Sequence, residues 1–228
     1  MFKRISQLMF PCRCSVCNKV IYLGNEMCDS CVYELRAIPE HISLMLISNP
    51  NINLRLGFKP AYSGVAAPYY HEDGGKSMIY NLKFKSRREL AMPISQEMYK
   101  TYKQYIEHKD IDCICCVPSK FKRTFVRGYD HVKILAKLMA EHTEIPFYPL
   151  LKINSKKKSQ HTLNAEERIK NIRGSFKINN KCQYNFKGKN VLLIDDIMTT
   201  GATISECSRV LKRKGAKNVY GLTATINL

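Results

Sequence analysis

Residues Val191 to Thr203, with the sequence VLLIDDIMTTGAT, constrain the fold of this 228-residue chain more than any other stretch. The first four residues are apolar and predict a strand buried on both faces, the type found in the middle of a parallel sheet. Asp195 and Asp196 follow at once, where such a strand is expected to end. The stretch therefore predicts a parallel sheet with two carboxylates at the end of one of its central strands.

A small, hydroxyl-rich turn follows the carboxylates and opens a predicted helix. It consists of Thr199, Thr200, Gly201, Ala202 and Thr203. Backbone amides, hydroxyls and a helix N-terminus then surround a point where an anion can bind. The neighbouring carboxylates suit a ligand that carries hydroxyls beside its phosphate, with a divalent cation as a further option. A phosphorylated sugar fits this description.

The charge of the chain predicts a polyanionic partner. Lysine and arginine together number 37 against 19 aspartates and glutamates, which gives a formal net charge of +18. Such an excess attracts nucleic acid, an anionic membrane surface or a polyphosphorylated small molecule. A strongly basic composition also occurs in ordinary soluble proteins, so the charge alone does not choose among these readings.

The sequence predicts a cytoplasmic protein. It has no apolar run long enough to span a membrane. The first residues, MFKRISQLMFPCRC, include a basic pair but no apolar core of signal-peptide length before the cysteines begin.

Two CxxC pairs near the start predict a metal site. Cys14 and Cys17 form the first pair, Cys28 and Cys31 the second, and ten residues separate the pairs. In a chain without an export signal, clustered cysteines bind metal more often than they form disulfides. Four thiolates from two tight turns close a tetrahedral zinc site with no open position, which predicts structural zinc. Redox dithiols or free thiols are the alternative, and Cys12 is close enough to compete as a ligand.

The chain is expected to divide into two domains. A helix is predicted to begin near Asp29, and the stretch from Glu40 to Lys59 has scattered apolar residues with an Asn-Pro-Asn run, which is typical of a linker. We therefore expect a zinc-binding domain with its linker over residues 1–58 and a larger domain over residues 59–228.

The larger domain shows alternating strand and helix patterns. Small and aromatic residues from Tyr62 to Tyr70 predict a strand, and the residues after Lys76 predict a helix. The further predicted elements are a helix over 90–108, in which Pro93 must lie in the first turn or break the helix, a buried strand over 111–117 with three core cysteines, a helix capped by Asp130, and an edge strand over 175–178.

Three basic clusters interrupt these elements. The first closes the helix after Lys76, the second follows Pro118-Ser119-Lys120 in a loop that contains Gly128, and the third lies in the loop over 152–173. Glycine permits close backbone approach and cations neutralise charge, so the second cluster resembles a phosphate or pyrophosphate cradle. The loop over 152–173 lacks apolar periodicity in its first half. It is either a mobile loop that closes over an anionic substrate or a solvated surface loop.

The order of these motifs resembles a known family. VLLIDDIMTTGAT is similar to the motif with which type I phosphoribosyltransferases bind phosphoribosyl pyrophosphate. The two CxxC pairs, the run VPSKFKRTFVRGYDH from Val117, and then Gln160, Leu163, Arg168, Asn171 and Phe176 resemble the ComF or ComFC family of competence-associated proteins. The resemblance covers almost the whole chain. It implies an α/β fold, a type I phosphoribosyltransferase-like, mostly parallel sheet flanked by helices, preceded by a small zinc-ribbon or knuckle domain.

The resemblance also implies roles for individual residues. Asp195 and Asp196 would hold the ribose hydroxyls, and residues 199–203 would surround the 5-phosphate. The pyrophosphate loop is expected at Pro118, Ser119 and Lys120. One motif departs from the family, because its usual Arg-Gly-Phe-Asn-Gln appears here as Arg-Gly-Tyr-Asp-His over residues 127–131.

Two functions are compatible with these features. The first is a cytoplasmic protein that binds phosphoribosyl pyrophosphate or a related sugar phosphate, and single-stranded DNA, during DNA uptake in natural transformation, with a competence helicase as the partner that the resemblance implies. Tyr69, Tyr70 and Tyr80, near the first basic cluster, would stack on bases.

The second function is transfer of phosphoribose to a nitrogen acceptor, a nucleobase or an amine, with Mg²⁺ offsetting the pyrophosphate charge. Thr199 stands where some base-salvaging relatives carry an aspartate, and threonine cannot act as a general base at neutral pH. This lowers the expectation of base transfer, and no catalytic residue is assigned.

Overall fold

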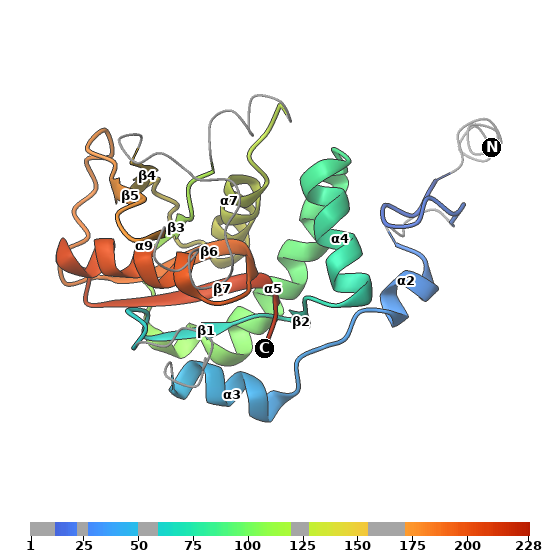
Figure 1. Cartoon of the computed structure of the whole chain (residues 1–228), viewed down its shortest axis with the longest axis horizontal. Coiled ribbons are helices and arrows are strands. Elements are labelled where there is room, and N and C mark those ends of the chain that lie inside the picture. The colour runs from blue at the N-terminus through green and yellow to red at the C-terminus, as the bar shows by residue number, and fades with distance from the viewer. Residues whose placement is uncertain (1–11, 22–26, 50–58, 120–127, 155–171) are drawn as a thin grey trace.

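A parallel sheet forms the centre of the computed structural model, which describes residues 12–21, 27–49, 59–119, 128–154 and 172–228 (Figure 1). Its main path has the order β1-β7-β6-β3. The strands are β1 (Gly64–Ala66), β3 (Cys113–Cys116), β6 (Asn190–Met198) and β7 (Asn218–Ile226). Residues 191–194 are fully buried within β6, so the predicted central strand is confirmed.

The β1 edge of the sheet is interrupted. The strand predicted over residues 62–70 consists of β1 and of β2 (Tyr69–Tyr70), which pairs with β7 further along. Pro68 lies between them and has no amide hydrogen to donate to a ladder. The chain from the cysteine segment crosses this edge instead: Ile38 N donates to Pro68 O at 3.0 Å and Tyr70 N to Arg36 O at 2.9 Å.

Helices cover both faces of the sheet. Alternate residues of a strand point to opposite sides, so each face has its own apolar side chains for helices to pack on. Val191 and Leu193 pack in one core cluster with α9 (Ala202–Arg213). Leu192 and Ile194 pack in a second cluster with three other helices. These are α4 (Asp73–Phe84), α5 (Ala91–Tyr105) and α7 (His131–Thr143).

Several predicted elements differ in extent from those observed. The predicted edge strand over 175–178 is β5 (Phe176–Ile178), which pairs with β4 (Leu151–Ile153) in a separate antiparallel hairpin. The helix expected from Asp29 towards Pro39 is only α2 (Asp29–Tyr33). The stretch expected to be a linker contains α3 (Glu40–Ser48), whose Leu46 and Ile47 are buried against the sheet.

The remaining regular elements are short. Two 3₁₀ turns, η3 (Arg88–Leu90) and η4 (Glu107–Lys109), flank α5. Of the two expected outcomes for Pro93, the structure has the first: it lies in the first turn of α5 and does not break the helix. Within the described ranges, none of the helices is both long and apolar enough to cross a lipid bilayer.

Glu206 fastens α9 to the chain that leads into β5. Its side chain is almost fully buried, and Oε1 accepts from Gly174 N at 2.6 Å and from Arg209 Nη2 at 2.6 Å. Oε2 accepts from Arg209 Nε at 2.7 Å. Burial alone would raise the pKa of Glu206, but the Arg209 guanidinium and the Gly174 amide lower it below its usual range.

We expect Glu206→Gln to reduce the free energy of unfolding at pH 7 by about 1–3 kcal/mol, because it removes charge-assisted hydrogen bonds from a buried site. The folded-state pKa is the lower one, so the carboxylate stabilises the protein above the pKa of the unfolded chain. This contribution is lost as the pH falls through the folded-state pKa. Urea unfolding should therefore show the difference between wild type and variant shrinking from about pH 5 towards pH 3.

The matched control is Glu141→Gln, which changes an exposed carboxylate on α7. It should alter stability by less than about 0.5 kcal/mol at either pH. A pH-independent loss in Glu206→Gln, or an equal loss in the control, would contradict the role assigned to Glu206.

Candidate functional site

The candidate site lies where β3 and β6 end, at the same edge of the parallel sheet. Asp195 and Asp196 lie inside β6 rather than directly after it, which corrects the expected end of the strand. The reason is the long ladder with β7, in which Ile197 still pairs with Thr225 and Met198 with Ile226. Both aspartates are consequently buried.

The two carboxylates belong to opposite faces of the sheet, because they are adjacent in a strand. Asp196 shares the face of Leu192 and Ile194, which α4 and α7 cover. There its Oδ2 lies 2.6 Å from His131 Nε2 and 2.8 Å from Lys83 Nζ. Asp195 Oδ1 instead accepts from the backbone amide of Asp196 at 2.9 Å.

The surroundings separate the pKa values of the pair. Burial, together with the charge of Asp196, raises the pKa of Asp195 well above its usual range. Burial opposes the charged form of Asp196 as well, but His131 and Lys83 lower its pKa. The arrangement therefore favours a single negative charge on the pair, carried by Asp196.

The turn after β6 leads into the N-terminus of α9, where backbone amides can bind an anion. Gly201 caps the helix with φ = 75°, in the left-handed region that glycine adopts without strain. Ser205 N donates to Gly201 O at 2.9 Å, so the helical hydrogen bonds begin at this glycine. Ala202 follows as the first helical residue and is buried, and Thr200 and Thr203 are half-buried. The amides of the first helical turn are then directed at this point, as a phosphate requires.

The end of β3 lies beside the acidic pair. Cys116 pairs with Ile194, and Val117 N donates to Ile194 O at 2.9 Å, so Pro118 and Ser119 follow at the level of the carboxylates. Ser119 Oγ donates to Asp130 Oδ1 at 3.0 Å. Lys120 lies outside the described residues, together with most of the second and third basic clusters.

Two of the three residues that depart from the family motif, Asp130 and His131, have side-chain partners at this site. Asp130 accepts from Lys133 N at 3.1 Å and so caps α7, as predicted, while it also holds Ser119. His131 is buried and contacts Asp196. The Asp-His pair thus connects the start of α7 to the ends of β3 and β6.

Sequence reasoning missed the link between Lys83 and Asp196. Lys83 belongs to the basic cluster that closes the helix after Lys76, yet its side chain is only 23% exposed. A signal existed, because Lys83 follows Ile79 by four residues and therefore lies on the buried side of α4. A lysine on the apolar side of a helix indicates an acidic partner.

A second candidate site is the four-cysteine cluster. The Sγ atoms of Cys14, Cys17, Cys28 and Cys31 all lie within 4.8 Å of one another, and those of Cys17 and Cys28 are 3.6 Å apart. A tetrahedral zinc with Zn–S bonds of about 2.3 Å needs sulfur separations of about 3.8 Å, so the cluster fits zinc. Cys12 is not in this cluster.

The backbone amides around Cys14 favour the thiolate form of this one ligand. Burial would raise the pKa of Cys14, but backbone amides, including those of Cys17 and Cys28, lower it to about 6. Two of these amides donate to Cys14 Sγ at 3.5 and 3.4 Å. Amides of this kind hold sulfur in the charged form that metals bind.

The core cysteines are not part of this cluster. Cys113, Cys115 and Cys116 are buried in β3, and burial raises the pKa of each. They are therefore inert core residues, as the sequence predicted.

The cysteine segment docks on α4. Asn81 Nδ2 donates to Val16 O at 2.9 Å, and Arg87 Nη2 donates to Asn18 Oδ1 at 2.9 Å. A cavity of about 720 Å³ remains between this segment and α4, with His71 and Tyr80 in its lining. This cavity is therefore beside the cysteine cluster rather than over the acidic pair.

Comparisons with known proteins agree with this geometry. Residues 126–224 match the family model described as a phosphoribosyl transferase domain, a range that holds the acidic pair and the turn after it. The chain is 24% identical over 212 residues to the DNA utilization protein YhgH of Shigella flexneri, covering 90% of this chain and 86% of that protein. It is 23% identical over 223 residues to competence protein F of Haemophilus influenzae, covering 93% and 97%. With competence protein ComFC of Bacillus subtilis it shares 26% identity over 147 residues, covering 64% and 57%.

The resemblance to the ComF and ComFC family is confirmed. The predicted fold is confirmed as well: a type I phosphoribosyltransferase-like parallel sheet flanked by helices, preceded by a cysteine cluster able to hold zinc. The alignments with the YhgH and competence F proteins extend over nine-tenths of the chain. The ComF-like character therefore extends beyond the phosphoribosyl transferase range.

We expect the protein, purified without chelators, to carry about one zinc per chain, because four thiolates saturate a tetrahedral ion. Cys28→Ser should lose the metal, and a chelator or acid should release it from wild type, since protons compete for thiolate. Atomic absorption gives the zinc content. Cys12→Ser is the matched control and should keep its zinc; equal loss from both variants would contradict the assigned ligand set.

Proposed function

We propose that this protein binds phosphoribosyl pyrophosphate, or a closely related sugar phosphate, at the carboxyl end of β6. The observation that carries the proposal is the acidic pair in β6 followed directly by the glycine-capped N-terminus of α9. The first-turn amides of α9 would donate to the 5-phosphate, and Asp195 and Asp196 would bind the ribose hydroxyls. Pro118 and Ser119, at the end of β3, lie where a pyrophosphate would extend.

Magnesium belongs to this proposal as a companion of the ligand. Mg²⁺ prefers carboxylate and phosphate oxygens. Asp196 does not fit as its ligand through Oδ2, because Lys83 and His131 already occupy that oxygen. Mg²⁺ would instead bind together with the pyrophosphate and offset its charge.

We further propose that the protein acts in the cytoplasm on single-stranded DNA during DNA uptake. The names of the relatives, competence protein F, ComFC and DNA utilization protein, favour a role in DNA uptake. The net charge of +18 supports a polyanionic partner. A competence helicase is the protein partner that the family resemblance implies, and this partner stays a prediction. The boundary between the two domains at residue 58 also stays a prediction.

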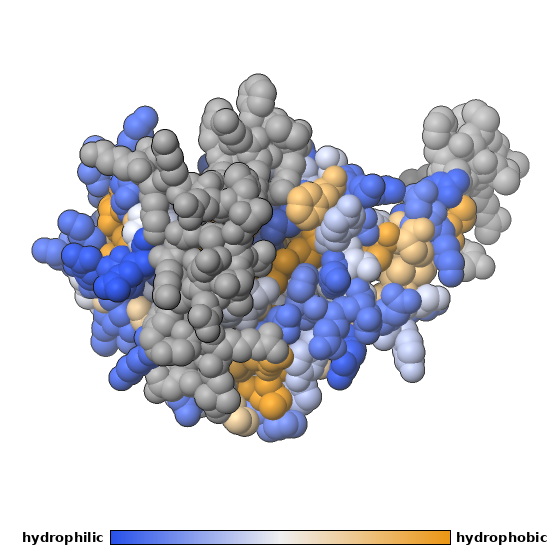
Figure 2. Space-filling view, in the orientation of Figure 1, coloured by the Kyte–Doolittle hydropathy of each residue, from blue (hydrophilic) through white to orange (hydrophobic). Residues whose placement is uncertain are grey.

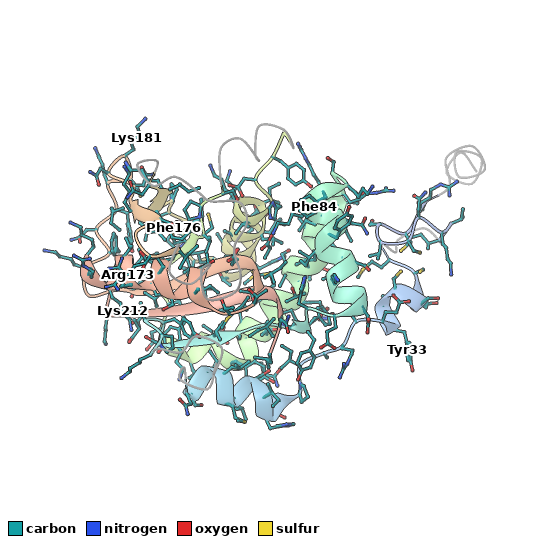
Figure 3. The ribbon with its side chains drawn as sticks, viewed as in Figure 1. Tyr33, Phe84, Arg173, Phe176, Lys181 and Lys212 are labelled. Atoms are coloured by element: carbon teal, nitrogen blue, oxygen red, sulfur yellow. The ribbon has the colours of Figure 1, made fainter. Side chains whose placement is uncertain are left out.

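The surface best suited to a single strand lies at the end of α4. Tyr80 and Phe84 are 51% and 54% exposed, and their ring centroids are 5.1 Å apart. Lys85 and Arg87 follow on the same stretch. Figure 2 shows an apolar patch beside hydrophilic groups over this end of α4, and Figure 3 places Phe84 there. Exposed rings beside cations provide base stacking and phosphate contacts.

Two of the tyrosines expected to stack on bases lie elsewhere. Tyr69 and Tyr70 form β2 and are half-buried against β7. Burial raises the pKa of Tyr69, which packs against the apolar core on the α4 and α5 side. Of the three tyrosines, Tyr80 is therefore the one available to a nucleobase.

We expect the double variant Asp195→Asn/Asp196→Asn to bind phosphoribosyl pyrophosphate, with Mg²⁺ present, at least tenfold more weakly than wild type, because it removes the charge and geometry that hold the hydroxyls. Isothermal titration calorimetry measures the affinity. Glu107→Gln/Glu141→Gln removes two exposed carboxylates elsewhere and should bind like wild type. Unchanged affinity in the aspartate variant would show that the ligand binds at another place.

The same samples distinguish binding from transfer. Wild type with Mg²⁺, phosphoribosyl pyrophosphate and a panel of nucleobases and amines is assayed for pyrophosphate release. Thr199 is exposed and offers a hydroxyl rather than a base, so we expect binding without release. Release with any acceptor would favour the phosphoribosyltransferase alternative and leave the binding site as assigned.

We expect Tyr80→Ala/Phe84→Ala to weaken binding of a fluorescent oligothymidylate by about tenfold or more, because each stacked base contributes about 1–3 kcal/mol. Fluorescence anisotropy over a salt series should show wild-type affinity falling as salt rises. Tyr33→Ala is the control: Tyr33 is 91% exposed on α2, well apart from Phe84 in Figure 3. No binding by wild type at low salt would overturn the DNA proposal.

A further inference from the structure

A charged cluster from three separate elements meets at Asp196. Lys83 comes from α4, His131 from the first turn of α7, and Asp196 from β6. Nζ of Lys83 and Nε2 of His131 lie 2.8 and 2.6 Å from the same carboxylate oxygen, Oδ2. The side chains of His131 and Asp196 are 4% and 7% exposed. We call these three residues the Asp196 cluster.

Stability alone does not account for the Asp196 cluster. A buried ion pair loses most of its attraction to the cost of leaving water, and apolar side chains of similar size often serve a core equally well. α4, α5 and α7 already pack through apolar residues such as Leu82, Met98 and Leu135. The cluster sits instead at the one edge of the sheet where the sugar-phosphate site lies.

The contacts of the cluster converge on orienting one carboxylate. Two donors from different helices fix Oδ2, and a carboxylate has lone pairs on both oxygens, so Oδ1 retains capacity to accept. The single described hydrogen bond of the His131 ring goes to Asp196, and its buried Nδ1 has no partner among the described residues. His131 is therefore placed to serve Asp196 rather than the packing of α7.

We propose that Lys83 and His131 are positioning residues of the sugar-phosphate site, which hold Asp196 through Oδ2 so that Oδ1 accepts from a ribose hydroxyl. Neither residue touches the ligand. The inference rests on the proposed function and deepens it, because it assigns how the site distinguishes ribose from a sugar that lacks a hydroxyl. General attraction of the phosphate by Lys83 is a different effect, since it would act on both sugars equally.

The test compares ribose 5-phosphate with its 2-deoxy and 3-deoxy analogues by calorimetry. Wild type should prefer ribose 5-phosphate by about tenfold over at least one analogue, as expected for one charge-assisted hydrogen bond. Lys83→Met and His131→Leu should each reduce this preference to about threefold or less, while affinity for the deoxy sugar changes by less than about twofold. Lys83→Arg and His131→Gln keep a donor and should restore most of the preference.

Two further variants complete the design. Lys137→Met removes an exposed lysine on α7 and should keep the full preference. In an Asp196→Asn background, Lys83→Met should cause no further change, because a residue that acts only through Asp196 has nothing left to position. Lys83→Met alone leaves the buried Asp196 carboxylate without its lysine, which can impair folding. The double variant has no carboxylate charge at position 196, so it tests the proposal even if Lys83→Met alone folds poorly.

The outcomes separate this inference from the proposed function. If wild type binds and prefers ribose but Lys83→Met and His131→Leu keep that preference, the positioning role is wrong and the site assignment stands. Equal losses for ribose and deoxyribose would likewise overturn positioning in favour of general attraction or misfolding. If wild type binds no sugar phosphate, both the proposed function and this inference fail.

Discussion

The parallel pairing of β6 with β3 on one side and β7 on the other determines where every group of the candidate site lies. Because all three strands run the same way, the acidic pair, the turn that caps α9 and the end of β3 reach the same edge. The ladder to β7 continues past the aspartates, so they are held in extended backbone and directed to opposite faces. A carboxylate on a loop would not have so fixed a direction.

Local patterns in the sequence predicted the parts of the site that are themselves local. The apolar run of β6, the glycine cap of α9 and the Asp130 cap of α7 each depend on residues a few positions apart. The paired CxxC turns are also local, which is why the cysteine cluster could be predicted. The contacts of Asp196 could not, because Lys83 and His131 come from helices distant in the chain.

Two elements differ from the sequence prediction, each for its own physical reason. α3 lacks a single apolar stripe, because Leu46 and Ile47 enter different core clusters, and it therefore resembled a linker. The strand over 62–70 was expected to be continuous although Pro68 lies within it, and a proline in a strand pattern is a sign of interruption. Tertiary packing positions α3, whereas Pro68 is itself the cause of the interruption between β1 and β2.

The chain between the cysteine cluster and α3 also closes an open edge of the sheet. Arg36 and Ile38 exchange backbone hydrogen bonds with Tyr70 and Pro68, where the edge would otherwise offer unpaired groups. Exposed strand edges recruit strands from other molecules. A metal on the four thiolates would fix the turns that precede this segment. Its removal would then loosen the segment and uncover a template for aggregation, so thiolates outside the sheet would protect the edge of the sheet.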